Sequence, residues 1–250
     1  MLHYLSQNCE EEPIMIKAIV FDLDDTLYDQ QRPFRQALIS VWNDPAAAGH
    51  VLTDLFEAFK HMNDRVAELE TLTMTQVFDR LNAVLDNHDL PALSHSVWLS
   101  FWDRYQKEAA HISLFKEIRE QMELLKEHYE LGIITNGETH TQKQKVQRLD
   151  LNQWIKSPNT VISDEVGLRK PDPRIFTYFN RLLNLQANEV VYIGDNFERD
   201  MVGAKKAGWH AFWFNHRQLD LPKSEFIPDQ TIESPAELAE LLQAMSVTTY

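Results

Sequence analysis

The feature that most constrains this chain is the segment 17–29, where a short apolar run ends abruptly in carboxylates. Residues 18–21 are continuous, apolar and partly β-branched, which is typical of a strand buried on both faces. Asp22 and Asp24 follow at once, and in an extended chain residues two apart point the same way. Ligands bind at the carboxyl ends of parallel strands, and crowded carboxylates repel unless a cation or proton separates them. The segment therefore predicts a divalent-metal site containing a nucleophile or an acid/base group, unless the acids are only turn residues.

After residue 112 the sequence alternates between helical and strand patterns, which predicts a parallel sheet connected by right-handed crossovers. The expected strands lie near 131–135, 160–163, 190–193, 210–214 and 229–232. The expected helices lie near 114–128, 140–149, 174–184, 198–207 and 235–245. The strand at 17–21 would join this sheet.

Residues 30–111 have almost purely helical patterns, with candidate helices at 31–43, 51–69, 73–86 and 94–110. An aromatic stripe at helical spacing, formed by Trp98, Phe101, Trp102 and Tyr105, is interpreted as core of a helix bundle. Because this block follows the first carboxylates directly, it would lie over the active end of the sheet as a lid or cap. We therefore expect an α/β core from 15–29 and 112–250, a helical cap from 30–111, and a polar tail at 1–14.

Three further clusters fall near the ends of later strands. Thr135, Asn136 and Gly137 end one strand with a hydroxyl, an amide and a flexible residue that lets N–H groups face an anion. Lys170 precedes a proline, which places its ammonium stiffly. Asp195 follows another apolar strand, as Asp22 does, and a further acid, Asp200, lies five residues on. Each cluster alone also fits a helix cap, a surface charge or a helix-start residue.

Taken in order, these clusters resemble the haloacid dehalogenase superfamily. The pattern of that family begins with a DxDxT run, here Asp22 to Thr26, and continues with a Ser or Thr at the end of the second strand, here Thr135. A lysine follows, here Lys170, and then an acidic run of the GDxxxxD type, here Gly194 to Asp200. The stretch 203–208 resembles the usual continuation, and the likeness covers nearly all of residues 15–245. The resemblance implies a Rossmann-like three-layer α/β core with an inserted all-helical (class I) cap domain.

By this resemblance Asp22 would be the nucleophile that forms an aspartyl-phosphate, and Asp24 the acid and then the base. Mg²⁺ would be held by Asp22, by the backbone carbonyl of Asp24 and by Asp195, which offer the oxygen ligands this ion prefers. Thr135, with Asn136 beside it, and Lys170 would bind the phosphoryl group. Asp200 would support the metal shell or Lys170.

The leading hypothesis is a Mg²⁺-dependent phosphatase acting on a small phosphorylated metabolite: a nucleotide, a sugar phosphate or a flavin-type phosphate. A metal-independent 2-haloacid dehalogenase would lack the second acid, which Asp24 supplies here. A sugar phosphomutase would have the same core and a helical cap, and a catalytically silent binding module is the remaining alternative.

Charge and cysteine content limit the expected binding partners and the expected cellular compartment. A net charge of −14 argues against a general nucleic-acid binder, since no basic surface offsets the phosphate backbone. The single cysteine, Cys9, excludes an internal disulfide, and with no signal peptide this points to the cytoplasm. We expect no membrane association, because no apolar run approaches the roughly 18–20 residues of a membrane span.

Overall fold

The computed structural model describes residues 15–42, 45–65 and 74–247. The predicted tail and the last residues of the predicted helix 51–69 lie outside this part of the chain. One six-stranded sheet has the order β3-β2-β1-β4-β5-β6, and every neighbouring pair is parallel. The strands are β1 (Ala18–Phe21), β2 (Glu130–Thr135), β3 (Thr160–Ile162), β4 (Val190–Gly194), β5 (His210–Phe214) and β6 (Gln230–Ile232). The predicted parallel sheet is confirmed, with the segment after Lys17 at its centre.

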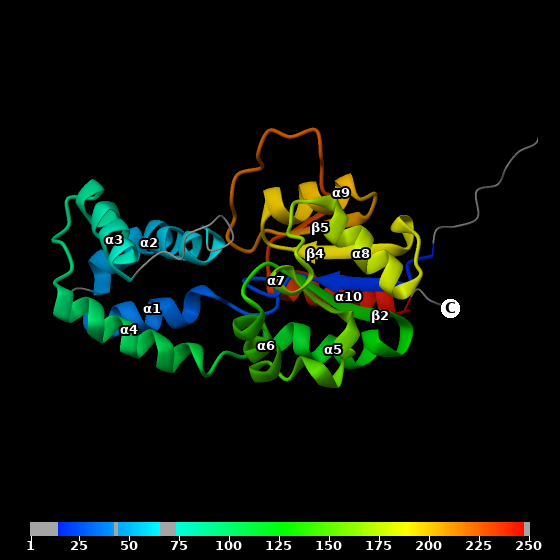
Figure 1. The fold of residues 1–250 in the computed structure, drawn as a ribbon, viewed down its shortest axis with the longest axis horizontal. Helices are drawn as coiled ribbons and strands as arrows, with labels where there is room; N and C mark the ends of the chain where they lie inside the picture. Colours follow the sequence, from blue (N-terminus) through cyan, green and yellow to red (C-terminus); the bar gives the residue numbers. More distant parts are fainter. Residues whose placement is uncertain (1–14, 43–44, 66–73, 248–250) are drawn as a thin grey trace, which may run out of the picture.

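Helices cover both faces of this sheet, which gives the predicted three-layer α/β core (Figure 1). The core helices are α5 (Lys116–His128), α6 (Thr139–Arg148), α7 (Ser163–Val166), α8 (Pro173–Leu183), α9 (Gly203–Lys206) and α10 (Pro235–Val247). The helix expected at 198–207 is instead a π-helical turn, η4 (Phe197–Val202), followed by α9. Short 3-10 turns, η1 (Leu151–Gln153), η2 (Ser157–Asn159) and η3 (Ala187–Glu189), complete the connections.

Alternate residues of each central strand enter opposite halves of the core. In β1, Ile19 and Phe21 pack with α5 and α10, whereas Ala18 and Val20 pack with α8 and the segment that follows β4. This is the period of two that a strand imposes on its side chains. Because both faces are apolar, the polar groups of β1 are confined to its carboxyl end, where Asp22 begins the site.

The remaining helices form a separate unit, at the left of Figure 1, beyond the carboxyl ends of the strands. They are α1 (Gln31–Val41), α2 (Pro45–Arg65), α3 (Met74–Asn87) and α4 (His95–Ala109). This helical unit has its own apolar cluster, in which Phe34, Phe59 and Phe101 meet at ring-centroid distances of 4.9–6.1 Å. Trp98 and Phe101 of the predicted aromatic stripe are fully buried there, and Trp102 and Tyr105 pack against them. The interpretation of the stripe as core is confirmed.

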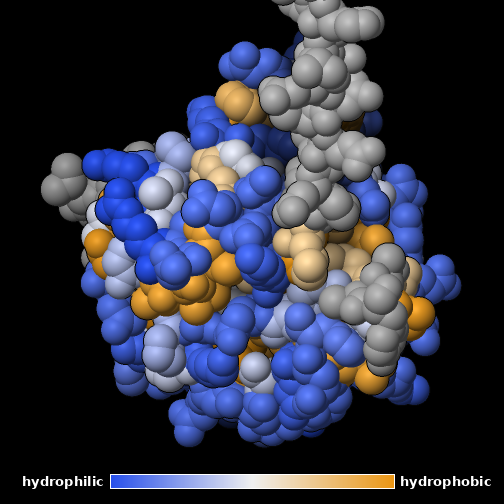
Figure 2. Space-filling model, turned by 90° about the vertical axis from the view of Figure 1, so that its right-hand side faces the viewer, coloured by the Kyte–Doolittle hydropathy of each residue, from blue (hydrophilic) through white to orange (hydrophobic). Residues whose placement is uncertain are grey.

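The opposite end of the molecule is mostly hydrophilic, with apolar groups in separated patches (Figure 2). Within the described ranges, no helix combines the length and apolarity needed to cross a bilayer.

Candidate active site

The predicted site residues meet at the carboxyl edge of the sheet, between the core and the helical unit. Asp22 follows β1, Thr135 ends β2, and Asp195 follows β4, so parallel strands deliver all three to one edge. Lys170 reaches the same place from the loop between α7 and α8. A cavity of about 100 Å³ there is lined by Asp22, Asp24, Gln30, Lys60, Thr135, Asn136, Gly137, Glu138, Thr141, Gln142, Lys145, Lys170 and Arg199.

Lys170 is the most deeply buried lysine among the described residues that line the cavity. Its Nζ donates to Asp22 Oδ1 at 2.7 Å, to Asp200 Oδ1 at 2.6 Å and to the Tyr192 hydroxyl at 2.8 Å. Burial alone would lower the pKa of Lys170, but Asp200 and Asp22 raise it, so the group stays an ammonium. Burial raises the pKa of Asp22 to about 7, against the opposing effect of Lys170.

Close backbone packing sets the position of Asp200. A Cβ on Gly194 would lie 2.5 Å from the carboxyl group of Asp200, so only glycine fits at the end of β4. Asp200 is fully buried, and its Oδ2 accepts the N–H of Asn196 at 2.9 Å. Asp200 therefore holds Lys170 in place and has both oxygens engaged.

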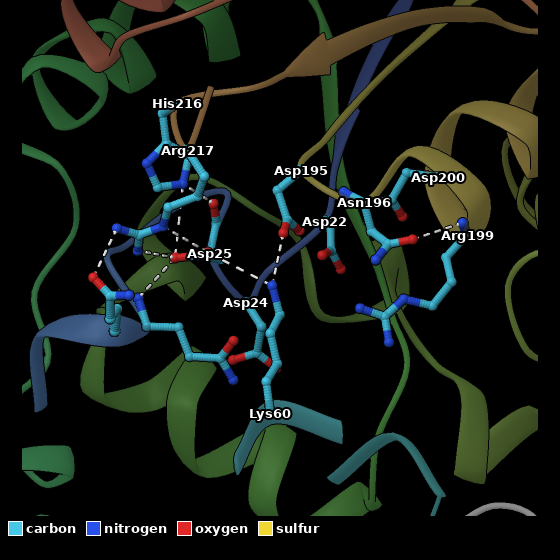
Figure 3. A network of polar contacts seen from close by, with 12 residues as sticks. Asp22, Asp24, Asp25, Lys60, Asp195, Asn196, Arg199, Asp200, His216 and Arg217 are labelled. Atoms are coloured by element: carbon cyan, nitrogen blue, oxygen red, sulfur yellow. Dashed lines mark hydrogen bonds and ion pairs between the residues drawn. The ribbon is translucent and has the colours of Figure 1, made fainter. Parts of the chain in front are cut away.

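The acidic groups fit a divalent cation. Single oxygens of Asp22, Asp195 and Asp200 lie within 4.8 Å of one another, and all three residues are buried. Oδ1 of Asp195 is buried and has no hydrogen-bond partner among the described residues. A buried carboxylate oxygen in that state carries a desolvation cost that a hard cation would remove. The donor set is therefore suited to Mg²⁺. Figure 3 shows the carboxylates of Asp22 and Asp195 close together, with Asp200 beyond Asn196.

The side chain of Asp24 is held apart from this cluster, although it lines the same cavity. Lys145 Nζ lies 2.6 and 2.7 Å from its two oxygens, Gln142 Nε2 donates at 2.9 Å, and the Tyr28 hydroxyl also donates. Burial by itself would raise the pKa of Asp24, but the Lys145 ammonium, with these hydrogen bonds, lowers it. Asp24 is thus held as a carboxylate that faces the cavity.

Thr135 and Asn136 have different surroundings. The Thr135 hydroxyl is buried and accepts from Gln142 Nε2 at 2.6 Å. The Asn136 amide binds the backbone of Lys170 in both directions, each at 2.9 Å. Any contact between Asn136 and a phosphoryl group would therefore come from its main chain, while its side chain positions Lys170.

The helical unit also brings a cation, Lys60, into the site. Lys60, on α2, donates to Asp195 Oδ2 at 2.9 Å and lies 3.6 Å from Asp25 Oδ2 (Figure 3). Although burial opposes it, Asp195 and then Asp25 raise the pKa of Lys60. Asp25, at φ 59°, turns away from the cavity, and Arg217 Nη2 binds it at 2.6 Å. The helical unit is thus tied to the core through charges at the site itself.

The sequence patterns above do not single out Lys60, Gln142 or Lys145. A signal for Lys60 exists, since it lies four residues after the buried Phe56, so a charge interrupts an apolar helical stripe. Gln142 and Lys145 lie three apart on α6, directly after the polar end of β2. Their spacing shows that they share a helix face but not that this face meets Asp24.

Known proteins with similar sequences include phosphatases. Glyceraldehyde 3-phosphate phosphatase of Methanopyrus kandleri is 27% identical over 238 residues, 93% of this chain and 99% of its own. The enzyme of that name from Pyrococcus furiosus is 30% identical, over 91% and 93% of the two chains. Human N-acylneuraminate-9-phosphatase is 26% identical, over 92% and 95%.

Solved structures confirm the fold. A dehalogenase with an intermediate complex superposes with a TM-score of 0.68 at 23% identity, covering 90% of this chain and 96% of its own. A hydrolase from Bacillus subtilis bound to magnesium gives 0.64 at 24% identity, covering 91% and 99%. The family profile of the haloacid dehalogenase-like hydrolases matches residues 19–214. The chain belongs to the haloacid dehalogenase-like hydrolase family, as the order of its motifs indicates.

Proposed function

We propose that the protein is a Mg²⁺-dependent phosphatase that hydrolyses a small phosphorylated metabolite through an aspartyl-phosphate. The observation that carries the proposal is the pair of carboxylates on one cavity, Asp22 bound to a buried ammonium and Asp24 held separately by α6. A dehalogenase mechanism has no use for the second carboxylate. The relatives named as phosphatases support the same choice.

Asp22 is the nucleophile of the first step. One carboxylate oxygen attacks phosphorus, the ester P–O bond breaks, and the phosphoryl group is left on Asp22. Lys170, 2.7 Å from Oδ1, offsets charge on the nucleophile and on the transferring group. Thr135, whose oxygen accepts from Gln142, donates its own proton to a phosphoryl oxygen.

Asp24 handles protons in both steps. It protonates the leaving oxygen, then takes a proton from the water that attacks the aspartyl-phosphate. The second role suits the carboxylate form that Lys145 favours in the free protein. The first role needs the protonated form, and a phosphate dianion entering beside Asp24 raises the pKa of that group by like-charge repulsion.

The metal ion would be held by Asp22, by Asp195 through its unpartnered Oδ1, and by the backbone carbonyl of Asp24. When bound, Mg²⁺ supplies positive charge that offsets phosphate oxygens. Asp200 stays with Lys170, because both of its oxygens already accept hydrogen bonds.

We assign residues 30–111 as a cap that selects the substrate, since this helical unit contributes Gln30 and Lys60 to the cavity wall. The cavity of about 100 Å³ accommodates a phosphoryl group with little beside it, which favours compact substrates. The single cysteine is consistent with the cytoplasm as the compartment.

The test is phosphate release across a panel of phosphorylated metabolites, comprising sugar phosphates, triose phosphates, nucleotides and flavin phosphates. We expect turnover with Mg²⁺, none in excess chelator, and recovery when Mg²⁺ is restored. Asp22→Asn should abolish turnover of every substrate. Full turnover in chelator, or by Asp22→Asn, would refute the proposal.

A further inference from the structure

The residues around Asp24 form a second polar cluster, supplied mainly by α6. Oδ1 of Asp24 accepts from the Tyr28 hydroxyl and from Lys145 at 2.6 Å. Oδ2 accepts from Lys145 at 2.7 Å and from Gln142 at 2.9 Å. Charge-assisted hydrogen bonds to both oxygens fix the rotation of a carboxyl group as well as its position.

The geometry of α6 explains how one helix reaches both groups. Gln142 and Lys145 are three residues apart and share a face of the helix. Gln142 is buried and also donates to Thr135 Oγ1 at 2.6 Å and to the carbonyl of Asn136 at 3.0 Å. The face of α6 that holds Asp24 is therefore anchored to the end of β2.

We propose that Lys145, assisted by Gln142, is the positioning residue that sets Asp24 for proton exchange with the substrate. The inference rests on the proposed function, because it assigns Lys145 a task within that reaction. Proton transfer requires the acid or base to lie within hydrogen-bond reach of the reacting oxygen. A misplacement of about 1 Å costs on the order of 100-fold in rate.

Lys145 differs from an ordinary surface lysine of the same helix. The Lys145 and Asp24 side chains are 16% and 18% exposed. Lys143, two positions away, is 58% exposed and pairs at 3.0 Å with Glu165, itself 45% exposed. Surface pairs of that kind contribute little to stability. Lys143→Met is therefore a matched control for Lys145→Met, because it makes the same substitution on the same helix at a residue that does not line the cavity.

The experiment is a double-mutant cycle between Lys145→Met and Asp24→Asn, with Lys145→Arg and Lys143→Met alongside. The substrate is an alkyl phosphate from the panel, assayed with Mg²⁺. We expect Lys145→Met to lower kcat roughly 10- to 100-fold, with KM changed less. Lys145→Arg should restore most of the rate, and Lys143→Met should stay within about 2-fold. In the Asp24→Asn background, Lys145→Met should cost less than about 3-fold, because residues that act through one group are not additive.

A second measurement separates positioning from phosphate binding. The burst of p-nitrophenolate from p-nitrophenyl phosphate reports the first step with a leaving group that needs little acid help. If Lys145 acts through Asp24, Lys145→Met should leave the burst rate nearly unchanged while slowing the alkyl phosphate. Thermal melting checks that the Lys145→Met variant is folded. If it is not, Lys145→Gln, which keeps a polar side chain but removes the charge, replaces it in the same comparisons.

The result that overturns the inference is additivity: Lys145→Met costing as much in the Asp24→Asn background as in the native protein. Equal loss in the burst and with the alkyl phosphate would also refute it, since Lys145 would then act on the phosphoryl group itself. Either result leaves the phosphatase proposal standing. An Asp24→Asn variant with native turnover of the alkyl phosphate would instead refute the acid/base role in the proposed function, and the Lys145 inference with it.

Discussion

Replacing Gly194 by alanine should damage stability and activity together. The new Cβ would lie 2.5 Å from atoms of the Asp200 carboxyl group, whereas real contacts of this kind are essentially never under 3.0 Å. Asp200 would have to retreat by about 1 Å to reach ordinary van der Waals separation. Its hydrogen bonds to Lys170 at 2.6 Å and to the Asn196 N–H at 2.9 Å would then stretch beyond bonding range.

The cost combines overpacking with a lost charged hydrogen bond. Overpacking a buried site costs about 1–3 kcal/mol, and a hydrogen bond to a charged group contributes about 1.5–3 kcal/mol. We therefore expect Gly194→Ala to lower the free energy of unfolding by about 2.5–6 kcal/mol. For a chain of this size that lowers Tm by roughly 5–24 °C. Because Lys170 loses a fixed partner, kcat should fall on the order of 100-fold. Thermal melting and phosphate release measure the two effects.

Gly49→Ala is the matched control. Gly49 lies in α2, and an added Cβ meets nothing within 4 Å. The substitution should stabilise the protein by about 0.5–1 kcal/mol, because alanine has the higher helix propensity. A Gly194→Ala variant with native Tm and native kcat would show that Asp200 need not stay where it is to hold Lys170.

Three further outcomes are expected. Asp22→Asn should give no phosphate adduct in intact-mass analysis after acid quench, whereas Asp24→Asn should accumulate one from p-nitrophenyl phosphate; equal adducts on both would mean that Asp22 is not the nucleophile. Burial raises the pKa of Asp22 to about 7, so the carboxyl group holds a proton below that pH. The affinity for Mg²⁺, measured by calorimetry, should therefore rise by up to about tenfold per pH unit as the pH increases towards 7. An affinity independent of pH would contradict this. Lys60→Met leaves Asp195 buried without its lysine partner, which should lower the free energy of unfolding by about 3–5 kcal/mol. The fall in Tm should be larger in chelator than with Mg²⁺, because a bound metal ion would offset the charge of Asp195. An equal fall in both would count against a metal at Asp195.

The elements of the core were predictable because their signals are local. Strand β1 is a continuous apolar run, and its partners recur at the spacing that crossovers require. The prediction placed the start of the helix 51–69 six residues too late, because α2 begins at Pro45. Proline suits the first turn of a helix, so this start is compatible with the local sequence. The π-helical turn η4 was missed because the local sequence is compatible with an ordinary helix, while the fit of Asp200 against Gly194 is a tertiary contact.

Most of the predicted site residues stand at strand ends, whereas Lys170 and Asp200 were predicted from the order of the motifs along the chain. Apolar runs that end in a polar residue indicated Asp22, Thr135 and Asp195, and the structure brings these residues to one edge of the sheet. Lys60 and Lys145 come from helices, where a lysine is usually a solvated charge. Their places depend on how α2 and α6 pack, and periodicity does not contain that information. Asn136 was predicted at the site, but the binding of its amide to the Lys170 backbone is a tertiary contact that the local sequence does not reveal.

The pairing of Asp22 with Lys170 spans 148 positions of the chain, and this has a consequence for synthesis on the ribosome. The central strand β1 is made first, but β2 and β4, its neighbours, follow the whole helical unit and more. In a nascent chain that ends before residue 170, Asp22 lacks the ammonium of Lys170, and at least one edge of β1 is unpaired. Contacts so distant in sequence slow folding and expose apolar strands meanwhile. The helical unit, whose described residues form an apolar cluster of their own, can acquire a core while the later strands of the sheet are still being translated.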